Sequence, residues 1–285
     1  MKRALLILLC CAGAAAAADR FVFKDVTPQS LELSENGTPV YVYNHGMMLA
    51  NGAPEDRRRS SYVHPLYAPN GAIVTDDFPK DHWHHRGVCW MWPIVIIDGK
   101  TYDEWMKMEV KQKFVRWAAK KAGRDRAVLA AENGWYLGDR RVAKEEVEIV
   151  AHPESGGKRD LDFTLRITAL DSPITLQGEM ANKKGYGGFN IRFAPRENTV
   201  VRTPGDDHAA DSDMKPLPWA ELAGTYNGKR AAARITQDKG NPGYPNGWCL
   251  RNYGFLGANY PGLEQFTLQP GKPLTLKYTV TVSSE

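Results

Sequence analysis

Alternation of apolar and polar residues with a period of two is the feature of this sequence that most limits its fold. In segment 161–167 every odd position is apolar and every even position polar, and segment 274–282 repeats the pattern near the C-terminus. Such alternation is typical of a β-strand with one face in a core. Asn-Gly and Asp-Gly pairs, which favour tight hairpins, separate the apolar runs. These pairs stand at positions 36–37, 70–71, 98–99, 133–134 and 227–228.

We predict an all-β chain, built as an antiparallel β-sandwich. About a dozen strand candidates follow one another at the spacing expected of a sandwich or barrel. Segment 102–108 is a candidate for one short helix. The sequence has no internal repeat and no Ser/Gly linker, and sandwiches of roughly 200–250 residues occur as single domains. We therefore predict one domain over residues 19–285.

Residues 1–18 have the composition of a secretory signal peptide. Lys2 and Arg3 give a positive start, residues 5–9 are apolar, and Ala16 to Ala18 supply the small residues of a cleavage site. We therefore predict export, to the periplasm or out of the cell. No later segment approaches the ~18 consecutive apolar residues of a membrane helix, so we predict no membrane span.

Net charge and cysteine usage exclude two further classes. The 285-residue chain has a formal net charge of +4, and the two basic residues of the leader account for half of it. So weak a charge does not indicate nucleic-acid binding. Only Cys89 and Cys249 follow the leader, and their spacing is not a zinc signature. In an exported protein they could form a disulfide, or they could remain two buried thiols.

The densest group of polar functional residues lies between residues 62 and 93. Four of the seven histidines are in this group, namely His64, His82, His84 and His85. Pro79 and the polar composition predict a loop over residues 76–86, and functional side chains concentrate on loops. On an extended backbone His82 and His84 point to one side and His85 to the other.

Three interpretations of this group stay open. The first is a divalent-metal site with His82 and His84 as ligands and a distant His or carboxylate as the third. The second is metal-free acid–base catalysis by His and Asp, with Arg86 stabilising negative charge. The third is a hydrogen-bonded network that pins a long loop. The density of such residues favours a functional site, with metal and metal-free versions nearly even.

A second group, residues 241–262, combines amides, aromatic residues and an arginine with turn formers. Amides and arginine donate to hydroxyls or carboxylates, and flat rings form an apolar wall. This mixture suits a carbohydrate, although a turn-rich cap of a β-fold is a nearly equal alternative. Weaker candidates are segment 184–188, whose glycines allow close backbone approach, and segment 206–208, which could complete a metal or acid–base set.

Four ordered motifs resemble the bacterial PmoA-like family, an exported family of unknown function. They are His64–Tyr67, the block 77–87, segment 184–188 and segment 241–254. The resemblance covers about residues 21–282, although Trp83 stands where we associate a proline with the family. The family name implies a methane oxygenase subunit, which is a membrane protein. Because we predict no membrane span here, we do not transfer that activity with the name.

The end of the chain resembles another group of proteins. Segment 268–271 and the alternating final strand look like the close of galactose-mutarotase-like β-supersandwiches, as does an early loop with Arg and His. The resemblance implies a carbohydrate-binding groove across one sheet, in a fold where several members are epimerases or lyases. Fold alone does not fix function.

We expect an exported carbohydrate-active enzyme that transfers a proton at a carbon of a sugar or oxidised sugar, by epimerisation or β-elimination. The expected catalytic residues are His64, Asp81, His82, His84, His85 and Arg86. One histidine of the 82–85 loop would be the base, His64 or Asp81 the acid, and arginine would hold a carboxylate or enolate oxygen. The expected substrate-binding residues are Trp90, Asn241, Trp248, Arg251 and Tyr253.

Two alternatives belong to other classes. A non-catalytic glycan-binding protein would use the same aromatic and amide residues without turning the sugar over. A metal-dependent oxidative enzyme, as the family name implies, would need a redox-active metal. The sequence contains no Gly-x-Ser-x-Gly elbow, dinucleotide fingerprint or kinase signature, so serine hydrolases and nucleotide enzymes are disfavoured.

Overall fold

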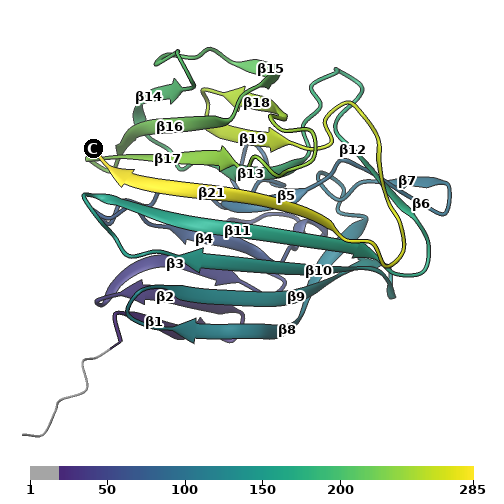
Figure 1. Cartoon of the computed structure of the whole chain (residues 1–285), viewed down its shortest axis with the longest axis horizontal. Coiled ribbons are helices and arrows are strands. Elements are labelled where there is room, and N and C mark those ends of the chain that lie inside the picture. Colours follow the sequence, from purple (N-terminus) through teal and green to yellow (C-terminus); the bar gives the residue numbers. More distant parts are fainter. Residues whose placement is uncertain (1–18) are drawn as a thin grey trace, which may run out of the picture.

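The strands form three antiparallel sheets, with an eight-stranded sheet in front of a nine-stranded one in Figure 1. The structure is a computed structural model that describes residues 19–285, so the predicted leader lies outside the described residues. The nine-stranded sheet contains, in order, β1 (Phe21–Thr27), β2 (Ser30–Glu35), β3 (Thr38–Asn44), β4 (Tyr62–Leu66), β5 (Val88–Met91), β13 (Gly188–Arg192), β19 (Phe255–Asn259), β18 (Gly247–Arg251) and β15 (Ser212–Pro216).

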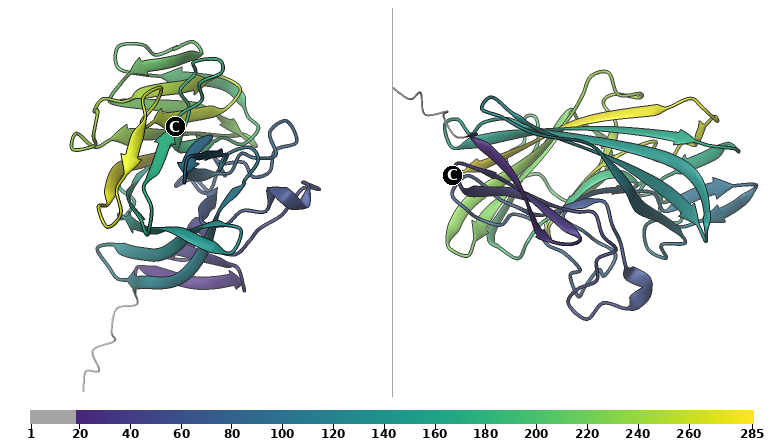
Figure 2. Two further views of the ribbon diagram at one scale, coloured as in Figure 1. Left: turned by 90° about the vertical axis from the view of Figure 1, so that its right-hand side faces the viewer. Right: turned by 90° about the horizontal axis from the view of Figure 1, so that it is seen from below.

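The other two sheets complete the architecture. The eight-stranded sheet contains, in order, β14 (Glu197–Arg202), β16 (Trp219–Tyr226), β17 (Lys229–Gln237), β21 (Leu274–Ser284), β11 (Lys158–Ala169), β10 (Arg140–Ala151), β9 (Ala127–Leu137) and β8 (Val110–Ala122). The small sheet contains β20 (Phe266–Leu268), β12 (Ile174–Gln177), β6 (Ile94–Ile97) and β7 (Lys100–Tyr102). Within residues 19–285 the one helical element is the 3-10 turn η1 (Glu55–Arg57), whose loop projects from the sheets in Figure 2.

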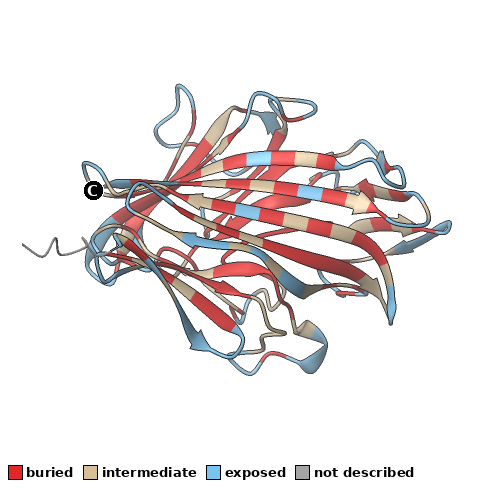
Figure 3. Cartoon of the chain, turned by 60° about the horizontal axis from the view of Figure 1, so that its bottom comes forward, coloured by how far each residue is buried: buried red, intermediate tan, exposed pale blue. Residues whose placement is uncertain are grey.

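The alternation in the sequence becomes the two faces of the eight-stranded sheet. Along β11 the residues Leu161, Phe163 and Leu165 are buried, while the residues between them are partly exposed. Figure 3 shows the same alternation of buried and more exposed positions along neighbouring strands. The antiparallel all-β prediction is therefore confirmed. The single-domain prediction stays a prediction.

Most of the predicted turns are present, and one is wrong. Asn36 and Gly37 have φ values of 49° and 79° and join β2 to β3, as the hairpin prediction required. Asn133 and Gly134 instead lie inside β9. The Asn133 side chain is buried and donates a 2.8 Å hydrogen bond to Glu145, so a tertiary contact overrides the local turn preference.

The predicted short helix over residues 102–108 is also wrong. β7 ends at Tyr102, and the following residues form an irregular loop. The Asp103 carboxylate accepts 2.6 Å hydrogen bonds from the backbone N–H groups of Trp105 and Met106. An aspartate that accepts hydrogen bonds from the backbone two and three residues later in the sequence stabilises a turn. The Asp103 carboxylate therefore stabilises an irregular loop here in place of the predicted helix.

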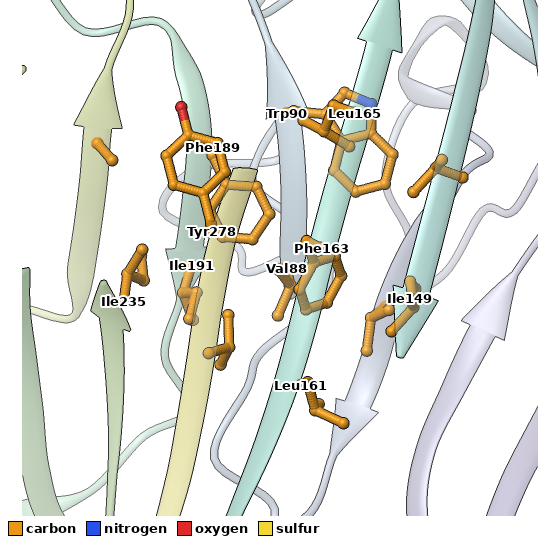
Figure 4. Packing of buried hydrophobic residues seen from close by; sticks show 14 of the residues in the cluster. Val88, Trp90, Ile149, Leu161, Phe163, Leu165, Phe189, Ile191, Ile235 and Tyr278 are labelled. Carbon is orange, nitrogen blue, oxygen red and sulfur yellow. The ribbon is translucent and has the colours of Figure 1, made fainter. Parts of the chain in front are cut away.

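The main core lies between the two large sheets. Phe189 on β13 stacks on Tyr278 of β21, with ring centroids 4.4 Å apart, and meets Phe163 of β11 edge-on at 5.2 Å. Trp90 of β5 is fully buried and lies parallel to Phe189 at 6.4 Å. Figure 4 shows these rings together with aliphatic side chains from both sheets. Burial of this apolar surface holds the sheets together.

A smaller apolar cluster lies on the opposite, outer face of the nine-stranded sheet. It consists of Tyr62, Cys89, Met91, Trp105, Cys249 and Phe255. Cys89 and Cys249 are both buried free thiols, which decides between the two predicted alternatives. In the described part of the chain, none of the secondary-structure elements is a helix with the length and apolarity to cross a membrane.

Candidate functional site

A pocket of about 220 Å³ opens over this outer cluster. It is lined by His82, His84, His85, Trp105, Met106, Lys184, Tyr186, Cys249, Arg251, Tyr253 and Phe255. The two polar groups singled out in the sequence therefore meet in one site, since the His82 and Tyr253 rings stack 5.4 Å apart. Segment 184–188, a weaker candidate in the sequence, contributes Lys184 and Tyr186.

The histidine loop is coiled rather than extended. The His82 N–H donates to the Pro79 carbonyl at 3.0 Å, and the His85 N–H donates to the His82 carbonyl at 2.8 Å. This turn brings all three histidines of the loop to the same pocket. The expectation that His85 points away from His82 and His84 is therefore wrong, because it assumed an extended backbone.

Four rings form a continuous stack along the pocket. In order they are Tyr253, His82, His85 and Phe255, with centroid separations of 5.4, 4.7 and 5.0 Å. His84 meets the stack edge-on, 5.6 Å from His82 and 4.6 Å from His85. Because neighbours cover both faces of the His82 ring and Nδ1 is buried beside Asp81, only the Nε2 side of the ring edge remains to contact a ligand.

Arg192, which the sequence analysis missed, organises one end of this stack. Its guanidinium donates to both oxygens of Asp81, at 2.8 and 3.0 Å, and lies 5.0 Å over the Tyr253 ring. Partial burial raises the pKa of Asp81, but the contacts with Arg192 and His82 together outweigh it, so the pKa is lowered overall. Asp81 Oδ2 lies 2.9 Å from His82 Nδ1, outside hydrogen-bond alignment, so the contact becomes an ion pair only when His82 is protonated.

His84 and His85 are held neutral. Burial lowers the pKa of His84 to about 3, and repulsion from His82, Arg86, Arg57 and Arg192 adds to the effect. Burial also places the pKa of His85 well below its ordinary value. Arg192 Nη1 lies 3.5 Å from His85 Nδ1. Because arginine can only donate, this long contact makes Nδ1 an acceptor and leaves the ring proton on Nε2.

The charged groups that line the pocket are cations. Arg251 donates to Asp213 at 2.6 Å and to the carbonyls of Ser212 and Leu250. The Lys184 ammonium has no ion pair among residues 19–285. The lining contains no aspartate or glutamate.

Hydrogen bonds to the Glu179 side chain fix the loop that carries Lys184. The Glu179 carboxylate accepts hydrogen bonds from the backbone N–H groups of Asn182 and Lys184, at 2.7 and 3.1 Å. Gly185 has a φ of 62°, and a Cβ there would lie 2.3 Å from the Met214 sulfur. A glycine is therefore required between the two lining residues Lys184 and Tyr186.

Two phenols complete the polar groups of the pocket. Partial burial raises the pKa of Tyr186 to about 12, with a contribution from Glu179. Partial burial likewise raises the pKa of Tyr253 to about 12. Both phenols are therefore protonated at neutral pH and are potential proton donors.

Two predicted substrate-binding residues lie in the core. Trp90 packs on Phe189, and Trp248 donates from its ring nitrogen to the Leu217 carbonyl at 2.7 Å. Both side chains are fully buried. Successive side chains on a strand face opposite ways, so Cys249 and Arg251 reach the pocket while Trp248 does not. The prediction that Trp90 or Trp248 walls a sugar ring is wrong.

Arg86 and Asn241 are structural instead. Arg86 is fully buried, lies 3.3 Å over the Phe78 ring and donates to the carbonyls of Trp83, His85 and Arg57. It cannot bind a substrate, but it holds the histidine loop. Asn241 is 5% exposed and exchanges hydrogen bonds with the backbone of Lys277.

His64 and segment 206–208 lie away from this pocket. His64 lies 3.0 Å from the Thr75 hydroxyl and lines a separate hollow beside Asp76 and Asp77. Asp206, Asp207 and His208 are exposed on another loop. Neither His64 nor segment 206–208 is placed to serve the His82 site.

Among the described residues, the predicted metal ligands His82 and His84 acquire no third ligand, either from His85 or from a distant side chain. The rings of His82 and His85 are stacked within 8° of parallel, so their in-plane lone pairs do not converge on one ion. His82 and His84 remain as a pair. Across residues 19–285, no three His, Cys, Asp or Glu side chains are grouped to hold a metal ion.

The apolar residues that line the pocket were not among the site residues predicted from the sequence. Trp105 and Met106 lie in the segment predicted as a helix, and Phe255 lies in a continuous apolar run. Trp105 meets Tyr186 at 5.1 Å and Phe255 at 5.9 Å. These contacts arise only when three distant segments assemble.

Several solved structures are similar to this chain at low sequence identity. Heparan sulfate lyase HepC from Pedobacter heparinus shares 8% identity, with a TM-score of 0.38, over 90% of this chain and 34% of that chain. A heparinase III shares 9% identity, with a TM-score of 0.38, over 96% and 38%. A GalM/aldose epimerase homologue from C. elegans shares 10% identity, with a TM-score of 0.39, over 94% and 99%.

The chain thus spans about a third of the length of the first two structures. TM-scores this low carry no inference about activity. No curated protein matches the sequence. A family model described as a family of unknown function, DUF6807, matches residues 30–285 and does not carry the PmoA-like name. The chain therefore belongs to the DUF6807 family of unknown function.

Proposed function

We propose that this protein is a carbohydrate-active enzyme that removes a proton from a sugar carbon next to a carbonyl or carboxyl group. The observation that carries the proposal is the edge of His82, held in a ring stack within one pocket that also contains two protonated phenols. The pocket, at about 220 Å³, is smaller than the roughly 300–1,000 Å³ typical for drug-sized ligands, so it suits one sugar ring.

His82 is the base in this proposal. Its ring is 36% exposed, whereas His85 is buried and the pKa of His84 is too low for efficient proton abstraction near neutral pH. Asp81 lies beside Nδ1 and stabilises the imidazolium that forms when His82 takes the proton. Arg192 holds Asp81 in that position and keeps it ionised. Asp81 is therefore an orienting group here, not the acid that the sequence suggested.

A tyrosine supplies the proton that completes the reaction. In β-elimination the carbon–hydrogen electrons form the new double bond, and the departing oxygen takes a proton from Tyr253 or Tyr186. In epimerisation the same phenol returns a proton to the opposite face of the carbon. Trp105 and Phe255 provide the apolar wall that the sequence assigned to Trp90 and Trp248.

Two further predictions from the sequence are part of this proposal. The first is that the leader directs export of the chain, and the second is that its family is related to PmoA-like proteins. Glycan binding without turnover is the alternative outcome of the test below.

The test is turnover of a panel of uronic-acid glycosides and keto-sugars by the wild type and a His82→Gln variant. Elimination is detected by ultraviolet absorbance of the unsaturated product, and epimerisation by NMR. We expect His82→Gln to lower kcat by about 10²–10⁴-fold, the usual contribution of a general base. His208→Gln, on an exposed loop, is the matched control. Binding without turnover in the wild type would contradict the enzyme assignment.

A further inference from the structure

We propose that the ligand of this pocket carries a carboxylate and that the Lys184 ammonium binds it. The inference rests on the proposed function and narrows its substrate from sugars with a carbonyl or carboxyl group to acidic sugars. Three observations carry it: the charges of the lining, the free ammonium of Lys184, and the fixed loop that presents it.

The lining is suited to an anion. It contains Lys184 and Arg251 but no acidic side chain. Carboxylates near the pocket are already engaged: Asp81 by Arg192, Asp213 by Arg251, and Glu179 by its own loop backbone. A neutral sugar would leave the charge of the Lys184 ammonium uncompensated, whereas a carboxylate would pair with it.

Lys184 and Arg251 contribute differently to this charge. Arg251 already donates to the Asp213 carboxylate and to two carbonyls, so its charge is largely compensated within the protein. Lys184 has no ion pair among residues 19–285 and is half-buried at the pocket wall. Its ammonium therefore has donors free for a ligand oxygen.

The neutral histidines are consistent with an anionic ligand. The positive charges of Arg86, Arg57 and Arg192 oppose the protonation of His84, which is partly buried in the pocket wall. The same positive surroundings favour negative charge on a bound molecule. When His82 removes the proton next to a carboxylate, the electron pair moves towards the carboxylate oxygens, and Lys184 stabilises the added negative charge there.

The experiment measures binding by calorimetry with the whole chain. The probes are glucuronate and galacturonate, with glucose and galactose as their neutral counterparts. The variants are Lys184→Gln and the matched control Lys183→Gln, an adjacent exposed lysine outside the pocket lining. We expect the acids to bind at least tenfold more tightly than the neutral sugars. Lys184→Gln should weaken acid binding by about 10–100-fold, and Lys183→Gln should leave it unchanged.

The outcomes separate this inference from the proposed function. Equal binding of neutral and acidic sugars, or an unchanged Lys184→Gln variant, would overturn the carboxylate assignment. Turnover of a neutral keto-sugar would then preserve the proposed proton transfer. Binding of none of the four probes by a folded wild type would also overturn the carboxylate assignment, whereas the proposed proton transfer is contradicted only if keto-sugars and uronic-acid glycosides are not turned over either.

Discussion

At the scale of single residues, the direction of a side chain along its strand decides whether it serves the site or the core. On β18 the neighbours Trp248 and Cys249 face opposite sides of the sheet. Sequence reasoning favoured Trp248 because a tryptophan is a good wall for a sugar. β18 is almost wholly buried on both faces, so its apolar run contains no alternation that distinguishes the core side from the pocket side.

His64 gives the stability of the protein a pH dependence. Burial lowers its pKa to about 4, below the unfolded value near 6.5. The unfolded chain therefore binds more protons in this window, so the stabilisation is complete above pH 6.5 and is lost as the pH falls towards 4. The slope from one such histidine is at most about 1.4 kcal/mol per pH unit.

We expect His64→Gln to lower stability at neutral pH but to flatten its decline between pH 6.5 and 4. Urea unfolding across this range measures the slope. His208→Gln, on an exposed loop, should leave the slope as in the wild type. A His64→Gln slope equal to that of the wild type would show that His64 does not titrate on unfolding.

At the scale of elements, strands and hairpins were predictable and the site loops were only partly so. Period-two alternation predicted β11 and β21 directly, and Asn36-Gly37 predicted the hairpin between β2 and β3. These features depend on near neighbours in the sequence. The coil of the 76–86 loop depends instead on Arg86, whose partners include a carbonyl 29 residues earlier, at Arg57.

Gly87 connects the histidine loop to β5, and this position has no room for a side chain. A Cβ at this position would lie 2.1 Å from the Val63 carbonyl oxygen on the neighbouring strand. Neither backbone can move freely, because the backbone N–H of Arg192 donates to the Gly87 carbonyl at 2.9 Å and Val63 is paired with Tyr43 of β3. We expect Gly87→Ala to destabilise the protein by about 1–3 kcal/mol, as overpacking does.

Denaturant unfolding checks this expectation. Gly123→Ala is the matched control, since its nearest contact would be an ordinary 3.5 Å. We expect Gly123→Ala to change stability by less than Gly87→Ala and to preserve sugar binding. Equal effects of the two substitutions would show that the close approach at Gly87 does not make this position intolerant of a side chain.

At the scale of the whole molecule, the nine-stranded sheet separates a core face from a site face. Phe189 packs between the large sheets on one face, and Tyr253 stacks on His82 at the other. The large sheets could be predicted as a sandwich from alternation. The pocket could not, because it joins segments around residues 84, 105, 185 and 251 that no local pattern relates.

This separation predicts two distinct mutational effects. Phe189→Ala removes a fully buried ring and should cost about 3–5 kcal/mol of stability. Tyr253 is 47% exposed, so Tyr253→Ala should cost much less stability while it weakens sugar binding. Unfolding and calorimetry on both variants measure the two effects. A Tyr253→Ala variant that loses as much stability as Phe189→Ala would contradict the separation.

The most direct test of the central claim is hydrogen exchange at carbon, followed by NMR in D₂O. Uronic acids, keto-sugars and their neutral parent sugars are incubated with the wild type and with His82→Gln. We predict that the wild type incorporates deuterium next to the carboxyl or carbonyl carbon, whether or not a product accumulates, and that His82→Gln does so about 10²–10⁴-fold more slowly. Binding without any exchange, or equal exchange by both proteins, would contradict proton transfer by His82.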